Sequence, residues 1–267
     1  SRHGVFNNVN NPTAFQMGLN PGVRTFSEDL RDAGYQLAYA GKYHISNEES
    51  PAARGWRELG EYGTHIIRPK PGLWQRRAAE PAPPDASRQF GQILRPGWGH
   101  VQAFGPVIDG PDALHHDRFY DTAILPGLRA IAELASSGRS WCLCVSTDMD
   151  HRSPVPKQFA DLYDPAKIEL PPSFHDPMLD KPRVYQRMRN MLWGQLTENE
   201  ARHALAHYYA LCSMQDHYLG MLLDALDKTG QADDTLVLFL ADHGDLGYQH
   251  GLADLGREVL LHRPGEV

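Results

Sequence analysis

Apolar residues recur at helical spacing in three stretches of the chain. This spacing predicts amphipathic helices over residues 25–33, 119–135 and 197–228. The first and the third open with a capping box, in which Thr25 stands before Glu28 and Thr197 before Glu200. A glycine lies just beyond the end of each of these two helices, as expected where the chain turns into a left-handed conformation.

Three short segments between the predicted helices have the character of strands. Residues 35–40 and 141–146 are short apolar stretches, and residues 235–240 form an uninterrupted apolar run. An uninterrupted run is typical of a strand that is covered on both faces. The alternation of strands and helices therefore predicts an α/β fold with a mostly parallel sheet flanked by helices.

Residues 51–118 depart from this alternation. Prolines are interleaved with glycines and arginines over most of this range. Such punctuation predicts an irregular insertion rather than a second core. We therefore expect residues 1–267 to form one domain interrupted by this insertion.

Composition and charge narrow the class of protein. The chain has 267 residues and a net charge of −7, which argues against a nucleic-acid partner. No apolar run approaches the ~18 residues of a membrane span. Only three cysteines are present, which argues against a disulfide scaffold and favours a reducing compartment, the cytoplasm. Cys142 and Cys144 alternate within a predicted strand, so we expect both to be buried on one face.

Charged residues and histidines follow the ends of all three predicted strands. They lie in the segments 41–44, 148–151 and 241–245. In open α/β sheets, ligands bind beyond the carboxyl ends of the strands.

Two of these strand ends carry specific chemistry. Asp242 and His243 are residue types that hold divalent metals, although a solvated turn would have the same composition. Lys42 and His44 flank one residue and would point to the same side of an extended segment, where they could receive an oxyanion. His151 and His250 are further polar candidates, and each could equally be a solvated histidine.

These segments, in this order, resemble the sulfatase family of the alkaline phosphatase superfamily. The similarity rests on ordered motifs: His3-Gly4-Val5, Thr25 to Leu30, Gly41-Lys42-Tyr43-His44, Leu170-Pro171-Pro172, and Asp242-His243-Gly244-Asp245. The choline-sulfatase-like and phosphonate-monoesterase-like branches are the most similar. The resemblance covers most of the chain outside about residues 51–118.

The resemblance implies a role for each matching residue. Asp242 and His243 would be metal ligands, around Ca²⁺ in a sulfatase or around Mn²⁺ or Zn²⁺ in a phosphonate-type relative. Lys42 and His44 would contact the sulfate and the nucleophile. His151 would protonate the leaving oxygen, although Asp150 stands where the family has proline. His250 is a possible substrate contact.

Some family motifs are missing from the chain. The C-x-P-S-R motif, whose cysteine becomes formylglycine, does not occur, and neither do the amino-terminal paired aspartates. Leu255 occupies the place of the family lysine after His250-Gly251-Leu252, and the nearest cation is Arg257. We therefore expect a sulfatase core that is incomplete at both ends and inactive as it stands.

The expected reaction is metal-dependent hydrolysis of a small sulfate ester. A phosphate or phosphonate monoester is the alternative substrate within the same superfamily. A non-catalytic oxyanion-binding module derived from such an enzyme is a second alternative. An unrelated α/β protein with a solvated histidine turn is a third.

Overall fold

The computed structural model describes residues 19–43, 45, 49–60, 87–94, 101–241 and 243–253. The chain divides into two compact units, which are treated separately below. The first unit comprises Ser1–Trp74, Leu114–Met149 and Gln215–Leu236. The second comprises Gln75–Ala113, Asp150–Met214 and Val237–Val267. His44 and Asp242, together with Leu255, Arg257 and the first eighteen residues, lie outside the described residues.

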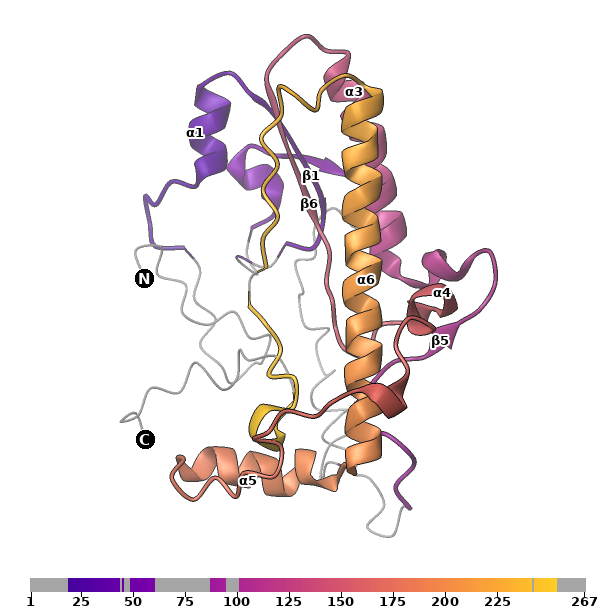
Figure 1. Ribbon diagram of the computed structural model, residues 1–267. Helices are drawn as coiled ribbons and strands as arrows, with labels where there is room; N and C mark the ends of the chain where they lie inside the picture. Colours follow the sequence, from indigo (N-terminus) through magenta and orange to yellow (C-terminus); the bar gives the residue numbers. More distant parts are fainter. Residues whose placement is uncertain are drawn as a thin grey trace. The chain divides into compact units, whose positions relative to one another are not determined.

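A parallel sheet forms the centre of the first unit. Its strands are β1 (Gln36–Gly41), β2 (Arg57–Leu59) and β6 (Trp141–Ser146), in the order β2-β1-β6. β1 pairs with β6 in register from Gln36 opposite Trp141 to Gly41 opposite Ser146, and the two lie side by side in Figure 1. The predicted strands at 35–40 and 141–146 are confirmed, and so is the α/β class with a parallel sheet.

Alternate side chains of this sheet pack against different helices. Leu37 and Tyr39 pack on one face with Cys142, Cys144 and Leu30 of α1 (Phe26–Asp32). On the other face, Ala38 packs with residues of α3 (Leu125–Ala135). The prediction that both cysteines share one face is confirmed, but both are partly rather than fully buried. Burial raises the pKa of the Cys144 thiol to about 11.

The helices begin where their sequences predict. Thr25 donates its backbone N–H to Glu28 at 2.9 Å, and Thr197 does the same to Glu200 at 2.8 Å. These capping boxes open α1 and the long helix α6 (Glu198–Lys228). The predicted helix at 119–135 is a π-helical turn, η3 (Tyr120–Ile124), followed directly by α3.

The predicted irregular insertion contains short elements. β2, within this range, pairs with β1 in parallel and extends the sheet. Short strands and helical turns occupy other described parts of the chain: β3 (Gln92–Ile93), β4 (Val101–Gln102), β5 (Val107–Ile108), β7 (Val155–Pro156), η1 (Pro51–Arg54), η2 (Ala113–His116), α4 (Lys157–Ala160), η4 (Pro165–Lys167), α5 (Arg183–Met191), η5 (Trp193–Gln195) and η6 (Gln249–Gly251).

The prediction of a buried strand at 235–240 is wrong. These residues form no ladder with any described strand, and Leu236 and Leu240 are 84% and 81% exposed. A strand needs an edge to which its backbone can bond, and an apolar sequence does not supply one. The apolar run therefore lies exposed in the described structure.

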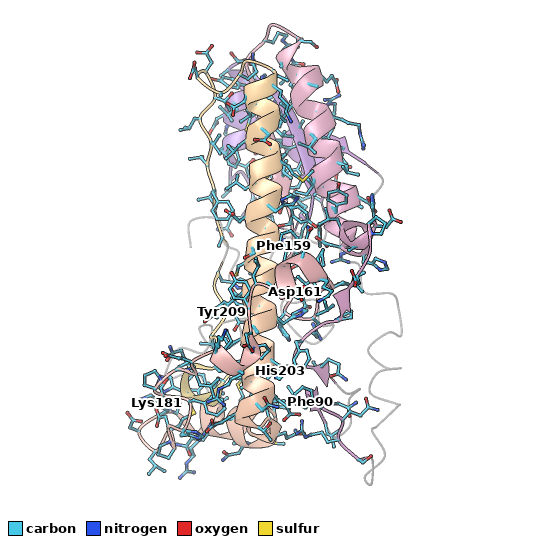
Figure 2. All side chains as sticks on the ribbon, turned by 45° about the vertical axis from the view of Figure 1, so that its right-hand side comes forward. Phe90, Phe159, Asp161, Lys181, His203 and Tyr209 are labelled. Atoms are coloured by element: carbon cyan, nitrogen blue, oxygen red, sulfur yellow. The ribbon has the colours of Figure 1, made fainter. Side chains whose placement is uncertain are left out.

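The second unit has its own apolar core. It gathers residues of α6 with aromatic and aliphatic side chains of neighbouring loops, among them Trp193, Leu196, Leu205 and Tyr248. His203 of α6 contacts Phe90 edge to face, with ring centroids 5.1 Å apart (Figure 2). None of the helices in the described part of the chain combines the length and apolarity needed to cross a membrane.

Candidate functional site

The carboxyl end of β1 is fixed by an unusually close approach to β6. Gly41 has a φ of 93°, and a Cβ at this position would stand 1.9 Å from the carbonyl oxygen of Ser146. The next residue, Lys42, donates its backbone N–H to the same oxygen at 2.9 Å. Only glycine permits this close contact. The contact and the Lys42 hydrogen bond together hold Lys42 at the carboxyl edge of the sheet.

Two tyrosines fix the backbone around Lys42. The hydroxyl of Tyr39 donates to the carbonyl oxygen of Lys42 at 2.6 Å. Tyr43 is buried against Tyr39, edge to face, with ring centroids 5.6 Å apart. Tyr43 thus anchors the segment in the apolar layer, while its neighbour Lys42 extends to a cluster of charged groups.

The Lys42 ammonium has a carboxylate partner that the sequence analysis did not identify. Its Nζ lies 3.0 Å from Oδ1 of Asp148, and Nη2 of Arg118 lies 3.6 Å from the other oxygen of that carboxylate. The register of β1 and β6 contained the signal, because parallel strands that end together bring the residues after them together. The Arg118 guanidinium also stacks on Phe119, 4.6 Å from the ring centroid.

A buried carboxyl supports this cluster. Asp117 accepts hydrogen bonds from the Tyr218 hydroxyl at 3.0 Å and from the backbone N–H of Phe119 at 3.1 Å. Burial raises the pKa of Asp117, and these hydrogen bonds oppose that rise. Asp117 and Phe119 flank Arg118 in the chain, so these hydrogen bonds hold the Arg118 backbone in place.

His151 lies in a compact turn of the second unit. Ser153 donates its backbone N–H to the carbonyl of Asp150 at 2.8 Å, which closes the turn. Burial works to raise the pKa of Asp150, but hydrogen bonds from Arg152 outweigh it and lower that pKa to about 2. The carboxylate lies 3.7 Å from Nδ1 of His151. The other ring nitrogen, Nε2, is buried with no hydrogen-bond partner among the described residues.

Two further groups hold this turn from outside. Nε2 of His207, on α6, donates to the carbonyl of Ser153 at 2.9 Å. A Cβ on Gly105 would stand 2.3 Å from the carbonyl oxygen of Arg152. The turn is therefore fixed on two sides, which gives the His151 backbone a defined place.

The C-proximal histidines lie in well-defined local contacts. Nδ1 of His243 lies 3.1 Å from the carbonyl oxygen of Gly244. Nδ1 of His250 lies 2.6 Å from Asp176, and its backbone N–H donates to Ser173 at 3.1 Å. The connector that contains Ser173 and Asp176 thus meets His250.

The predicted site residues that the structure describes are divided between the two units. Lys42 belongs to the first unit, whereas His151, His243 and His250 belong to the second. In the described part of the chain, no three histidine, cysteine, aspartate or glutamate side chains gather as a metal site. The described residues therefore do not by themselves make a metal shell.

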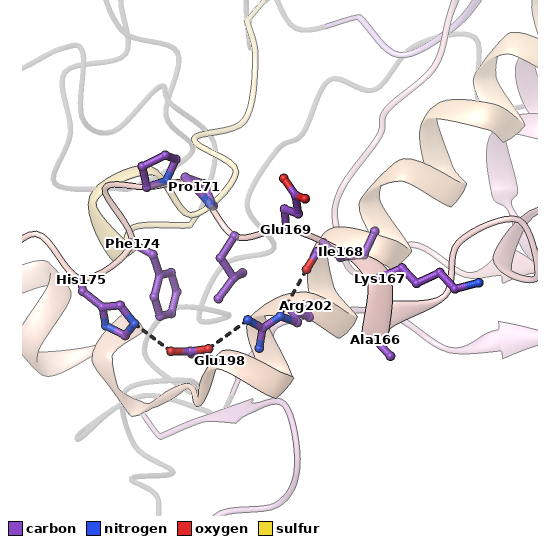
Figure 3. Close-up of a pocket in the computed structure, with 11 residues that line it drawn as sticks. Ala166, Lys167, Ile168, Glu169, Pro171, Phe174, His175, Glu198 and Arg202 are labelled. Carbon is purple, nitrogen blue, oxygen red and sulfur yellow. Dashed lines mark hydrogen bonds and ion pairs between the residues drawn. The ribbon is translucent and has the colours of Figure 1, made fainter.

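A shallow pocket of about 700 Å³ lies in the second unit, between the 166–175 segment and the start of α6. In Figure 3, Glu198 bridges His175 at 2.8 Å and Arg202 at 3.0 Å, and Arg202 also bonds the carbonyl of Ile168. The predicted site residues are not among those that line it. His175, Glu198 and Arg202 are bonded to one another, so these three side chains form a structural network.

Residues 1–264 match the family model described as Sulfatase. The chain belongs to the sulfatase family. Membership explains the order of the motifs along the chain.

Curated sulfatases and an alkaline phosphatase superfamily protein share parts of the sequence. Choline-sulfatase of Rhizobium meliloti (strain 1021) is 35% identical over 240 residues, which cover 86% of this chain and 44% of that protein. Arylsulfatase K of Danio rerio is 47% identical over 57 residues, 21% of this chain and 11% of that protein. A multifunctional alkaline phosphatase superfamily protein of Trinickia caryophylli is 45% identical over 62 residues, 23% of this chain and 12% of its own length.

Comparison with solved structures supports the fold. The phosphonate monoester hydrolase of Silicibacter pomeroyi superposes with a TM-score of 0.50 and 20% identity, over 88% of this chain and 50% of that one. The chain thus spans about half the length or less of the sulfatase and hydrolase that it matches over most of its own length.

Proposed function

We propose that this chain supplies the oxyanion-binding and leaving-group residues of a sulfate ester hydrolase. The observation that carries the proposal is the position of Lys42. The Gly41–Ser146 contact fixes it at the carboxyl edge of a parallel sheet, and its ammonium lies 3.0 Å from Asp148. Sulfatase family membership supports hydrolysis of a sulfate ester at such an edge.

Lys42 binds the sulfate through a charge-assisted hydrogen bond, which is strongest when negative charge develops on the non-bridging oxygens. His44 is proposed to share this contact. His151 holds a proton at Nε2 and gives it to the leaving oxygen, a transfer that suits an imidazole near neutral pH. The buried Nε2 atom, without a partner among the described residues, supports this role.

Asp242 and His243 are the proposed ligands of a divalent metal, which would neutralise oxyanion charge when bound. Carboxylate oxygen suits Ca²⁺ or Mn²⁺, and imidazole nitrogen suits Zn²⁺, so the pair alone does not select the ion. His250 remains a proposed substrate contact. Its Nδ1 meets Asp176, which would leave Nε2 to face a substrate.

The proposed substrate is a small sulfate ester. The similarity to choline-sulfatase over most of this chain favours sulfate over a phosphonate or phosphate monoester. A non-catalytic oxyanion-binding role requires the same Lys42 contact and no proton transfer from His151. We propose a cytoplasmic location, since three cysteines give no disulfide pattern.

A segment exchange tests the hydrolytic role. This chain would replace the matched residues of the Rhizobium meliloti choline-sulfatase, and turnover of choline sulfate would be measured. We expect turnover by the chimera and a loss of at least about 100-fold with Lys42→Met or His151→Ala, because each removes a group that acts on the transition state. Lys228→Met, at the exposed end of α6, is the matched control and should leave turnover unchanged.

The outcomes separate the alternatives. Loss of turnover with Lys42→Met but not with His151→Ala would assign oxyanion binding and reject the proton-transfer role. Equal turnover of all variants would reject both roles. A chimera that does not fold would move the test to sulfate binding by the chain itself, as described below.

A further inference from the structure

The charged cluster after β1 and β6 has an arrangement that oxyanion binding by Lys42 alone does not explain. Its three members, Lys42, Asp148 and Arg118, all belong to the first unit. One carboxylate faces two cations, at 3.0 Å from Lys42 and 3.6 Å from Arg118. The Asp148 carboxylate therefore has a second cation within reach besides Lys42.

The three side chains differ in how tightly they are held. The Lys42 and Asp148 side chains are 18% and 30% exposed, whereas Arg118 is 60% exposed. Arg118 stacks on the buried Phe119, and the backbone beside it is fixed by the bonds of Asp117. The guanidinium thus reaches Asp148 from the solvent side at a distance longer than a direct hydrogen bond.

An oxyanion that binds Lys42 must displace the Asp148 carboxylate from the Lys42 ammonium. The carboxylate competes for the ammonium and repels an anion placed beside it. A second cation that moved onto the carboxylate would relieve both effects, because it would satisfy the oxygens that Lys42 leaves. Arg118 already lies within 3.6 Å of the carboxylate and carries a fork of donors suited to it.

We propose that Asp148 is the resting counter-ion of Lys42 and passes to Arg118 when an oxyanion binds. Both are positioning residues, since they act on the substrate through Lys42. The proposal rests on the proposed function, in which Lys42 binds the oxyanion. It adds that a sulfate or phosphate group binds Lys42 by displacing the carboxylate of Asp148.

The exchange predicts opposite effects of two substitutions on anion affinity. Asp148→Asn removes the competitor and the repulsion, so sulfate affinity should rise about five- to tenfold. Arg118→Gln leaves the displaced carboxylate without a partner, so affinity should fall by about the same factor. Arg118→Lys should restore part of the loss. In the Asp148→Asn background, Arg118→Gln should have less effect, because the two residues act together.

The test is isothermal titration of the 267-residue chain with sodium sulfate at constant ionic strength. Lys42→Met is the positive control for site loss. Asp224→Asn removes the same charge from an exposed position of α6 in the first unit, and should change affinity less than about twofold. Thermal melts followed by circular dichroism would show that each variant folds.

The result that supports the proposal is tighter binding by Asp148→Asn together with weaker binding by Arg118→Gln. Sulfate binding only by Asp148→Asn would also support it, because the carboxylate would then mask Lys42. Unchanged or weaker binding by Asp148→Asn, with Lys42→Met still losing affinity, would overturn the proposal and leave the proposed function standing. Absence of binding in every variant would overturn both. If Asp148→Asn does not fold, an unchanged affinity in Arg118→Gln overturns the proposal by itself, and a fall that Arg118→Lys restores supports it.

Discussion

A methyl group on Gly41 would stand 1.9 Å from the carbonyl oxygen of Ser146. Gly41→Ala would also place that methyl 2.7 Å from the side chain of Ala123, at a backbone φ of 93°. We expect a loss of at least about 2 kcal/mol in the free energy of unfolding, measured in urea.

The control for this substitution is Gly138→Ala. Gly138 has a φ of 65° and open space where its Cβ would lie, so only the backbone penalty of about 1 kcal/mol applies. Equal losses in the two variants would show that the close approach of β1 and β6 does not restrict residue 41.

Glu200 connects the start of α6 to the 88–91 segment of the second unit. Its buried carboxylate accepts bonds from Arg88 at 2.7 and 2.8 Å and from the backbone of Gly91 at 2.7 Å. Burial works to raise the pKa of Glu200, but these bonds and those from Thr197 lower it to about 2. Glu200→Gln should cost about 3 kcal/mol at pH 7, measured by urea unfolding.

The same carboxylate gives a pH dependence. A lowered folded pKa stabilises the protein above the unfolded value, near pH 4.5, and this stability is lost as the pH falls toward 2. In Glu200→Gln, the free energy of unfolding should therefore fall less steeply between pH 4.5 and 2 than in the unmodified protein. Glu198→Gln removes a half-exposed carboxylate in the same turn and should cost much less stability than Glu200→Gln. An acid profile unchanged by Glu200→Gln would contradict this account.

His207 is expected to hold the turn that carries His151. His207→Ala removes the bond to the Ser153 carbonyl, so amide exchange at Ser153 and Val155 should become faster. His207→Gln can still donate and should restore part of the protection. His203→Ala, which removes a contact to Phe90 instead, should not change exchange in this turn.

Protonation of His207 at low pH should also lower the amide protection of this turn. Burial lowers the pKa of His207, so the folded state favours the neutral ring. Its contribution to stability is present above about pH 6.5, the ordinary histidine value, and is lost as the pH falls below it. Constant protection of the turn from pH 8 to 5 would contradict this expectation.

The exposed run at 236–240 should promote self-association. Leu236, Leu238 and Leu240 are each more than two-thirds exposed, and Phe239 lies between them. A contiguous apolar run without charge is a site of intermolecular pairing. Leu238→Lys should lower light scattering at high protein concentration without lowering the melting temperature. Leu162→Lys, at an isolated exposed position, should leave the scattering unchanged.

Local signals in the sequence predicted much of the fold. The capping boxes at Thr25 and Thr197 each act within one helical turn, and both helices begin where those residues place them. β2 escaped prediction because its three residues become a strand through pairing with β1 rather than through a pattern of their own. The run at 235–240 is the opposite case, because it has the apolar pattern of a strand and pairs with no described strand. An apolar pattern indicates a preference for burial, but the partner must come from elsewhere in the fold.

The candidate site was predictable in part. Lys42 follows from its strand end, and the structure places it at the carboxyl edge of the sheet. Its pairing with Asp148 depends on the register between β1 and β6, which residues far apart in the sequence determine. His44 and Asp242 lie outside the described residues, so their roles remain predictions.

The measurement that tests the central claim most directly is the affinity of the 267-residue chain for inorganic sulfate, with and without Lys42→Met. Lys42 is the cation that the Gly41–Ser146 contact places at the edge of the sheet. The account predicts that Lys42→Met weakens binding at least about tenfold, because it removes a charge-assisted hydrogen bond. Equal affinity of the two proteins, with both folded by circular dichroism, would contradict it.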